Sequence, residues 1–173
     1  LGVDARHYIK LDKRSILAFR LTGLTSLGNE HIAYYLGGVN NWFFPRYNDL
    51  IPLPQNKQFA YQGLAANMRG FPQNIRNGSS YALLNMEARI PFLQYLSRKK
   101  LRSTFYRNLQ LVGFVDVGSA WHGLSPYSED NPLNMLTIER PPTLNVLVNY
   151  YRDPIVLGYG IGMRALVFGY FLK

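Results

Sequence analysis

Glycines, histidines and serines are the residues of this chain that could take part in catalysis or cofactor binding. Gly158, Gly160 and Gly162 resemble the start of a dinucleotide-binding loop, but that motif needs a further glycine where the chain has Met163. A helix should also follow such a loop, and none is expected here. We therefore predict no cofactor at these glycines, which in a strand relieve crowding and allow curvature.

The histidines and serines give no better candidate for a catalytic site. His7, His31 and His122 are far apart in the sequence, and no two of them are spaced for joint metal ligation. The G-x-S-x-G elbow of serine hydrolases does not occur. The chain has no cysteine, which excludes disulfides and thiolate metal sites. We predict that the protein is not an enzyme and binds no cofactor or metal.

Two further polar motifs have simple structural interpretations. Asn77-Gly78-Ser79 fits a glycosylation sequon, but Asn-Gly before a strand is more typical of a turn. Glu129 and Asp130 lie in a segment rich in Pro, Ser and Asn, where an ion could bind but nothing else in the sequence supports one.

Composition limits the class of protein. The 173 residues suffice for one domain, and a hydrophobic fraction of 47% excludes disorder. No run of about 18 apolar residues occurs, so a transmembrane helix is not predicted. Strands of a membrane barrel alternate lipid-facing and lumen-facing residues and need no such run. The aromatic content of 14% fits the aromatic girdles of such barrels, although Tyr-rich soluble sandwiches also exist.

The formal net charge of +9 raises nucleic-acid binding as an alternative. The basic residues are spread along the chain, and the one cluster, Arg98-Lys99-Lys100 with Arg102, lies between two strand-like runs. We interpret this cluster as a solvated turn and predict no nucleic-acid partner. A soluble β-rich nucleic-acid-binding domain remains the third interpretation of the sequence.

Alternation of polar and apolar residues is the main structural signal. It predicts strands at about 1–10, 15–26, 79–92, 105–121 and 155–166, and a last strand that begins near Gly169. In the third strand, one face is apolar and the other is largely polar. The apolar face holds Ala82, Leu84, Met86, Ala88 and Ile90, and the other holds Tyr81, Leu83, Asn85, Glu87 and Arg89. Each run is long enough for a tilted strand to cross a bilayer.

The predicted connections are short at one end of the strands and long at the other. Asp12-Lys13 and the turn near Val167-Phe168 are short, whereas 27–78 and 122–154 are long. Outer-membrane barrels have short periplasmic turns and long outer loops, although the 93–104 connection is longer than this pattern expects.

The 27–78 connection is too long to be structureless in a compact domain. It also holds Trp42, Phe43 and Phe44 among its prolines. We expect this segment to pack against the rest of the fold.

Five segments resemble, in order, the C-terminal half of the BamA/TamA/FhaC-type outer-membrane barrels, the bacterial surface antigen family. They are Leu36-Gly37-Gly38, Met68-Arg69-Gly70-Phe71, Asn85-Met86-Glu87-Ala88-Arg89-Ile90-Pro91, Gly113-Phe114-Val115-Asp116-Val117-Gly118, and Gly158-Tyr159-Gly160-Ile161-Gly162-Met163-Arg164. About thirty residues, 39 to 67, separate the first two segments, which is longer than in most members. This insertion is most similar to a Bacteroidota-type subgroup.

The resemblance implies a site. In the family, the R-G-F loop folds into the lumen and its arginine contacts the barrel wall, so Arg69 would meet Asp116 and Glu87. The alternation independently places both carboxylates on the polar face. The full set implied is the loop residues Met68, Arg69, Gly70 and Phe71, the wall partners Asp116, Glu87 and Phe114, and the supporting residues Gly113, Gly118 and Arg89. Gly70 would let the backbone approach the wall, and Phe71 would be an apolar anchor.

We thus predict one all-β domain over 1–173, the C-terminal strands of an antiparallel transmembrane β-barrel with a long loop in its lumen. Six strands are too few for such a barrel, so the chain is expected to be a piece of a longer protein that supplies the others. By resemblance it would insert or translocate polypeptides at the bacterial outer membrane. Its partners would be membrane lipid, lipopolysaccharide and client outer-membrane proteins. The alternative is an outer-membrane anchor or pore without assembly activity.

Overall fold

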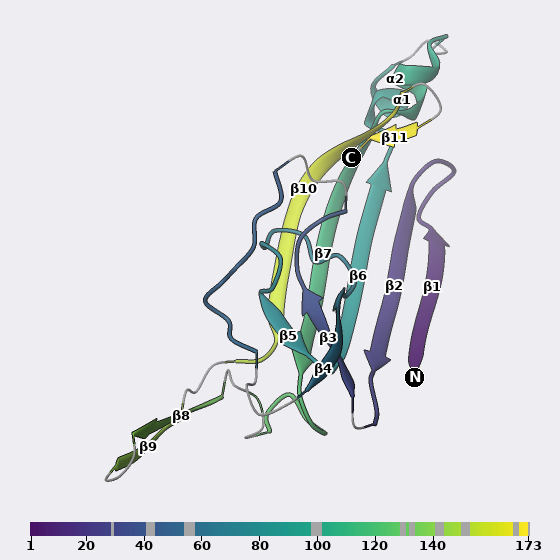
Figure 1. Ribbon diagram of the computed structural model, residues 1–173. Helices are drawn as coiled ribbons and strands as arrows, with labels where there is room; N and C mark the ends of the chain where they lie inside the picture. The colour runs from purple at the N-terminus through teal and green to yellow at the C-terminus, as the bar shows by residue number, and fades with distance from the viewer. Residues whose placement is uncertain are drawn as a thin grey trace.

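A six-stranded antiparallel sheet dominates the computed structural model, with the strand order β1-β2-β6-β7-β10-β11 (Figure 1). The structure describes residues 1–28, 30–40, 44–53, 58–97, 102–128, 131, 134–140, 144–149, 153–167 and 170–172. The strands of the main sheet are β1 (Gly2–Lys10), β2 (Ile16–Thr25), β6 (Ser80–Ile90), β7 (Gln110–Trp121), β10 (Val156–Val167) and β11 (Tyr170–Leu172). Within the described residues the sheet is open, with β1 and β11 at its edges.

All six predicted strands are present, with one boundary that was wrong. The strand predicted over 105–121 begins at Gln110, because Thr104–Asn108 forms the short helix α2. A second short helix, α1 (Phe92–Leu96), lies in the same connection. The fold is therefore mostly strands with two helical turns, instead of all strands. The predicted last strand starts at Tyr170, and Phe168 and Gly169 lie outside the described residues.

Strand register divides the main sheet into two faces, which we call the bare face and the covered face. Residues that pair across β1, β2, β6, β7 and β10 share a face. One such row defines the bare face and consists of His7, Phe19, Met86, Val115 and Tyr159. In these five strands the bare face carries no Asp, Glu, Lys or Arg. Its large apolar side chains are widely exposed; Ile161, for example, keeps 83% of its accessible area.

The covered face changes character along the strands. At the end of the sheet where β2 leads into the insert and β6 begins, this face is apolar, with Tyr81, Leu83 and Ala120 buried. Toward the other end it is charged, because Arg20 and Glu87 lie there. One end of this face can therefore support an apolar core, while the other holds polar groups.

The predicted long loop 27–78 is instead a folded insert. It contains β3 (His31–Leu36), β4 (Phe59–Leu64) and β5 (Arg76–Gly78), which form a second small sheet with β3 in the centre. β3 pairs in parallel with β4 and antiparallel with β5. The expected turn at Asn77-Gly78 is wrong, since both residues belong to β5.

The insert packs on the apolar part of the covered face, as the sequence required of so apolar a segment. The core joins Leu36, Ala66 and Met68 of the insert to Tyr81 and Leu83 of β6. Leu36 and Met68 are fully buried. Of the aromatic residues that prompted the expectation, Phe44 is 86% exposed, and Trp42 and Phe43 lie outside the described residues.

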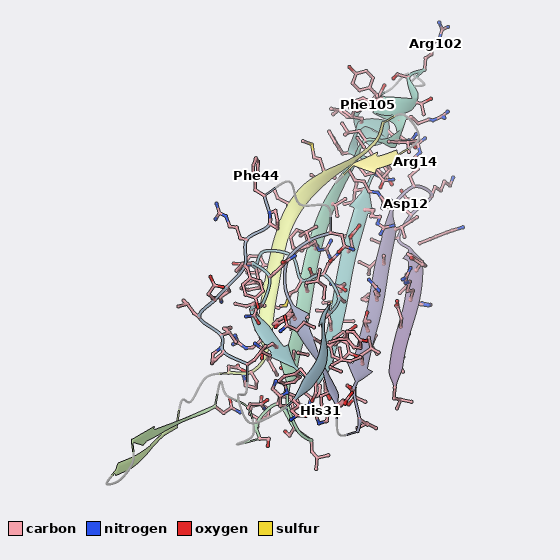
Figure 2. All side chains as sticks on the ribbon, in the orientation of Figure 1. Asp12, Arg14, His31, Phe44, Arg102 and Phe105 are labelled. Atoms are coloured by element: carbon pink, nitrogen blue, oxygen red, sulfur yellow. The ribbon has the colours of Figure 1, made fainter. Side chains whose placement is uncertain are left out.

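The connections leave the sheet at opposite ends (Figure 1). The β1–β2 turn, the two helices and β11 lie at one end; Figure 2 places Asp12, Arg14 and Phe105 there, and His31 at the other. The 26–79 and 122–155 connections lie at the far end. The second of these contains the hairpin β8 (Met135–Arg140) and β9 (Leu144–Asn149). Arg98-Lys99-Lys100, predicted as a solvated turn, lies outside the described residues.

None of the described helices is both long enough and apolar enough to span a membrane.

Candidate functional site

Arg69 lies in a tight turn of the insert between β4 and β5. Gly70 follows it with a φ of +89°, a backbone conformation that residues with a side chain rarely adopt. A Cβ at Gly70 would meet no atom within 4 Å, so the turn requires glycine for its dihedral angle. The expectation that Gly70 allows close approach to the wall was therefore wrong.

The main-chain N–H and all three side-chain nitrogens of Arg69 donate hydrogen bonds to carboxylates on the covered face. Its main-chain N–H and its Nε donate to Asp116 Oδ2 at 2.9 and 2.8 Å, and Nη2 donates to Asp116 Oδ1 at 2.7 Å. Nη1 donates to Glu87 Oε2 at 2.7 Å. The side chain thus makes a two-pronged contact with one carboxylate and a single contact with another, a geometry that lysine cannot copy.

The two carboxylates come from neighbouring strands of the main sheet. Asp116 of β7 pairs with Asn85, two residues before Glu87 on β6, so both side chains lie on the covered face. Glu87 also accepts a hydrogen bond from Arg89 Nε at 2.6 Å. The Asp116 side chain is fully buried, so its charge depends on Arg69 for compensation.

Phe114 and the glycines of β10 complete the wall under Arg69. The Arg69 guanidinium lies 4.1 Å from the centre of the Phe114 ring, close enough for a cation–π contact. Gly160, the β10 partner of Phe114, leaves room for that ring, because a Cβ there would come within 2.9 Å of it. Gly160 therefore serves packing, whereas an added Cβ at Gly162 would meet no atom within 4 Å.

Gly158 is where the loop comes closest to the sheet. A Cβ added at Gly158 would overlap the carbonyl oxygen of Arg69 and lie 3.1 Å from the Phe71 ring. Phe71 packs against the core and its carbonyl accepts a hydrogen bond from Gly38, so it anchors the turn as expected of it. The close approach that the sequence analysis attributed to Gly70 is thus provided by Gly158, on the opposite side of the contact.

The electrostatics of the group favour its charged form. Burial acts to lower the pKa of the Arg69 guanidinium, but hydrogen bonds to the Asp116 and Glu87 carboxylates raise it above its ordinary value. An arginine that stays protonated at all working pH values is suited to a permanent structural contact.

The remaining predicted residues divide into two groups. Arg89 binds Glu87, and Gly118 packs closely under Leu83 and Leu36. Gly113, in contrast, lies on the bare face, where an added Cβ would meet nothing within 4 Å. Gly113 therefore does not support the site, because its position in the strand points away from it.

A second charged group was missed by the sequence analysis. Asp4 of β1 binds two arginines: Nε and Nη2 of Arg6 at 3.3 and 3.0 Å, and the same atoms of Arg20 at 3.1 and 2.8 Å. Arg6 and Arg20 are paired directly across β1 and β2. The two-residue turn predicted at Asp12-Lys13 would have placed Arg6 opposite Phe19. The observed turn contains Arg14 as well, since Leu11 N–H bonds to the Ser15 carbonyl, and this shift places the two arginines opposite each other.

The other polar motifs of the sequence do not form a site. Asn77 is buried and its Nδ2 donates to Asn74 Oδ1 at 2.9 Å, so the sequon is not open to modification in this fold. Among the described residues, no group of His, Cys, Asp and Glu could hold a metal ion. Glu129 and Asp130 lie outside the described residues.

The site brings together a fixed ion-pair network without an exposed nucleophile in it. We call the contacts of Arg69 with Asp116 and Glu87 the latch, because they hold the insert on the covered face of the main sheet. In comparisons with known proteins, no family model, no curated protein and no solved structure matches this chain.

Proposed function

We propose that this chain contributes strands to an outer-membrane β-barrel of the protein assembly and translocation superfamily, which inserts or translocates polypeptides at the bacterial outer membrane. The observation that carries the proposal is the docking of Arg69, from an R-G-F turn, onto Asp116 and Glu87 of the sheet. This is the contact that the resemblance to the BamA/TamA/FhaC-type barrels implies.

The two faces of the sheet support a membrane location. A bare face without charged residues, with Ile161 and Tyr159 widely exposed, is costly in water and suits lipid. The five long strands have 9 to 12 residues, about the number that a tilted strand needs to cross a bilayer. The covered face would then line the lumen, with the insert inside it.

In this proposal the latch fixes the shape of the lumen. Client polypeptides would use the seam between the first and last strands of the complete barrel. The Arg69 contact would hold the insert against β6 and β7, so that the strands near the seam can move while the insert stays in place.

The alternative is an outer-membrane anchor or pore without assembly activity. One observation favours it: every nitrogen of Arg69 is already bonded, and the insert covers the apolar end of the face as a static plug would. In that case the latch stabilises the protein and has no further role.

Replacing Arg69 by alanine in cells tests the proposal against this alternative. An assembly barrel with Arg69→Ala should reach the outer membrane, yet growth and the levels of other outer-membrane proteins should fall. The matched control is Arg46→Ala, because Arg46 is an exposed residue of the same insert. Unchanged growth and unchanged outer-membrane protein levels, with the variant present in the membrane, would favour the anchor or pore.

A further inference from the structure

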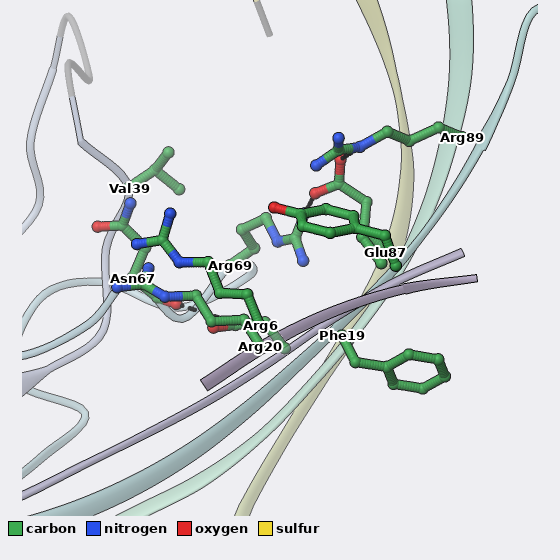
Figure 3. Close-up of a pocket in the computed structure, with 11 residues that line it drawn as sticks. Arg6, Phe19, Arg20, Val39, Asn67, Arg69, Glu87 and Arg89 are labelled. Atoms are coloured by element: carbon green, nitrogen blue, oxygen red, sulfur yellow. Dashed lines mark hydrogen bonds and ion pairs between the residues drawn. The ribbon is translucent and has the colours of Figure 1, made fainter. Parts of the chain in front are cut away.

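A cavity of about 230 Å³ lies on the covered face beside the Arg69 latch (Figure 3). Arginines from three strands and the insert line it: Arg6 of β1, Arg20 of β2, Arg89 of β6 and Arg69. Glu87 is the acidic residue among the lining side chains. In Figure 3 Phe19 points to the other side of the sheet, so the cavity belongs to the polar face alone.

The arginines around this cavity outnumber the carboxylates that bind them. Asp4 is shared by Arg6 and Arg20, and Glu87 is shared by Arg69 and Arg89. Asp116 is the third carboxylate and binds Arg69. Four guanidinium groups thus share three carboxylates, so these seven side chains together carry one net positive charge.

Arg6 and Arg20 converge on a single carboxylate, that of Asp4. Both place Nε on Asp4 Oδ1 and Nη2 on Asp4 Oδ2, so two like charges converge on one carboxylate. Opposite charge on their other side would relieve the repulsion between them. Their side chains keep 54% and 37% of their accessible area, so an ion can reach them.

Several guanidinium nitrogens near the cavity have no protein partner within the described residues. Arg20 keeps Nη1, and Arg89 keeps both Nη atoms because only its Nε binds Glu87. These donors belong to two neighbouring strands, β2 and β6. A planar carboxylate offers two oxygens, whereas a tetrahedral oxyanion offers acceptors in several directions and matches arginine forks.

We propose that this cavity is an oxyanion site that binds a phosphate group carried by a soluble molecule. The ligand would lie between Arg20 and Arg89 and supply the missing negative charge. Lipid phosphate is the less suitable source, because the cavity opens on the covered face and the apolar bare face lies on the other side of the sheet. The arginine cluster does not depend on the proposed role in assembly, whereas the choice of a soluble ligand over lipid rests on the membrane location proposed above for the bare face.

Titration of the full chain, folded in detergent, with inorganic pyrophosphate tests the site by calorimetry. We expect saturable binding, with acetate at equal ionic strength binding at least about ten-fold more weakly. Loss of a charged hydrogen-bond donor should weaken pyrophosphate binding by roughly ten- to a hundred-fold in Arg20→Gln. Arg20→Gln leaves the pair between Arg6 and Asp4 in place.

The control is Arg107→Gln, the same substitution in the exposed helix α2, outside the lining of the cavity. It should leave pyrophosphate binding within about two-fold of the unmodified chain, well below the change expected at a charged contact. Absence of saturable binding, equal weakening in both variants, or equal binding of acetate would overturn the proposal. Should Arg20→Gln fail to fold, the comparison of pyrophosphate with acetate on the unmodified chain decides alone.

Discussion

Arg69 and Asp116 are joined by three hydrogen bonds, two to Oδ2 and one to Oδ1 of the carboxylate, all between 2.7 and 2.9 Å. One of them comes from the main chain of Arg69, so the position of the loop itself is fixed along with its side chain. The carboxylate is fully buried. This relationship links the insert to the main sheet and leads to the first two predictions.

Arg69→Lys should release the turn although it keeps the charge. Lysine cannot reproduce the planar two-pronged contact, and it cannot reach Asp116 and Glu87 together in the same geometry. We expect faster amide hydrogen exchange at residue 69, whose main-chain N–H is bonded to Asp116 in the docked turn. Arg46→Lys, an exposed change in the same insert, should leave this exchange unchanged. Equal protection of both variants would show that the fork geometry does not hold the turn.

Removing the side chain of Arg69 should lower the free energy of unfolding more than Arg69→Lys does. Arg69→Ala leaves Asp116 buried and unpaired, which typically destabilises a protein by about 3 kcal/mol or more. Urea unfolding of the folded protein measures this change. The double variant Arg69→Ala with Asp116→Ala should recover part of the loss, because the buried charge is removed as well. Additive losses in the double variant would contradict a direct coupling of the two residues.

Gly158→Ala should displace the turn from the other side of the same contact. The new methyl group would overlap the carbonyl of Arg69, and such overpacking costs about 1–3 kcal/mol. Gly162→Ala is the matched control on the same strand, since a Cβ there meets nothing within 4 Å. Amide hydrogen exchange at residue 69 should rise in the first variant and stay unchanged in the second. A Gly158→Ala protein that is as protected as the control would mean that the turn does not contact β10.

The main sheet could be predicted from the sequence because its signal is local. Alternation along each strand separates residues such as Met86 from Glu87 without knowledge of the partner strand. The insert was not predicted, because the parallel pairing of β3 with β4 joins segments that are far apart in the sequence. The helix at Thr104–Asn108 was mistaken for strand, since five residues are too few to distinguish the two periods.

The site was predictable only in part, because some of its contacts join segments that are far apart in the sequence. Asp116 and Glu87 follow from the alternation, and Arg69 follows from the resemblance of its motif. The role of Gly158 does not, because a close approach between a strand and a remote loop leaves no periodic signal. Asp4 with Arg6 and Arg20 required the hairpin register in addition to the alternation.

A charge placed on the bare face tests whether that face contacts lipid or water. Ile161→Arg places arginine on a side chain that is 83% exposed in the middle of β10. In a bilayer this costs about 2–4 kcal/mol, whereas in water an exposed change is nearly neutral. Leu124→Arg is the control, because Leu124 is exposed in the connection after β7. Folding yields in lipid vesicles should drop for Ile161→Arg alone. Equal yields for the two variants would argue that the bare face does not contact lipid.

Asp12 in the β1–β2 turn should respond to pH. The main-chain N–H of Lys13 and the Tyr95 hydroxyl donate to its carboxylate and lower the pKa of Asp12. Since the pKa is lower in the folded state, the stabilisation is present above the unfolded value of about 3.9 and is lost as pH falls through the folded value. An NMR titration should show the pKa of Asp12 rise in Tyr95→Phe and remain below its ordinary value. An unchanged pKa in that variant would contradict the contact.

The most direct test of the central claim is a disulfide between Arg69→Cys and Asp116→Cys in outer membranes isolated from cells that make the complete barrel protein, with any cysteine outside this chain replaced. This chain offers no competing cysteine, and the hydrogen bond from the Arg69 main chain to Asp116 brings the two positions close. Arg107→Cys with Asp116→Cys is the control, because Arg107 lies in α2 before the start of β7 whereas Asp116 lies well inside that strand, so the extended chain keeps the two positions apart. An efficient bond in the first pair alone, in the membrane fraction, is the predicted result. No bond in a protein that has reached the outer membrane would contradict the docked loop, and absence of the protein from that membrane would contradict the barrel.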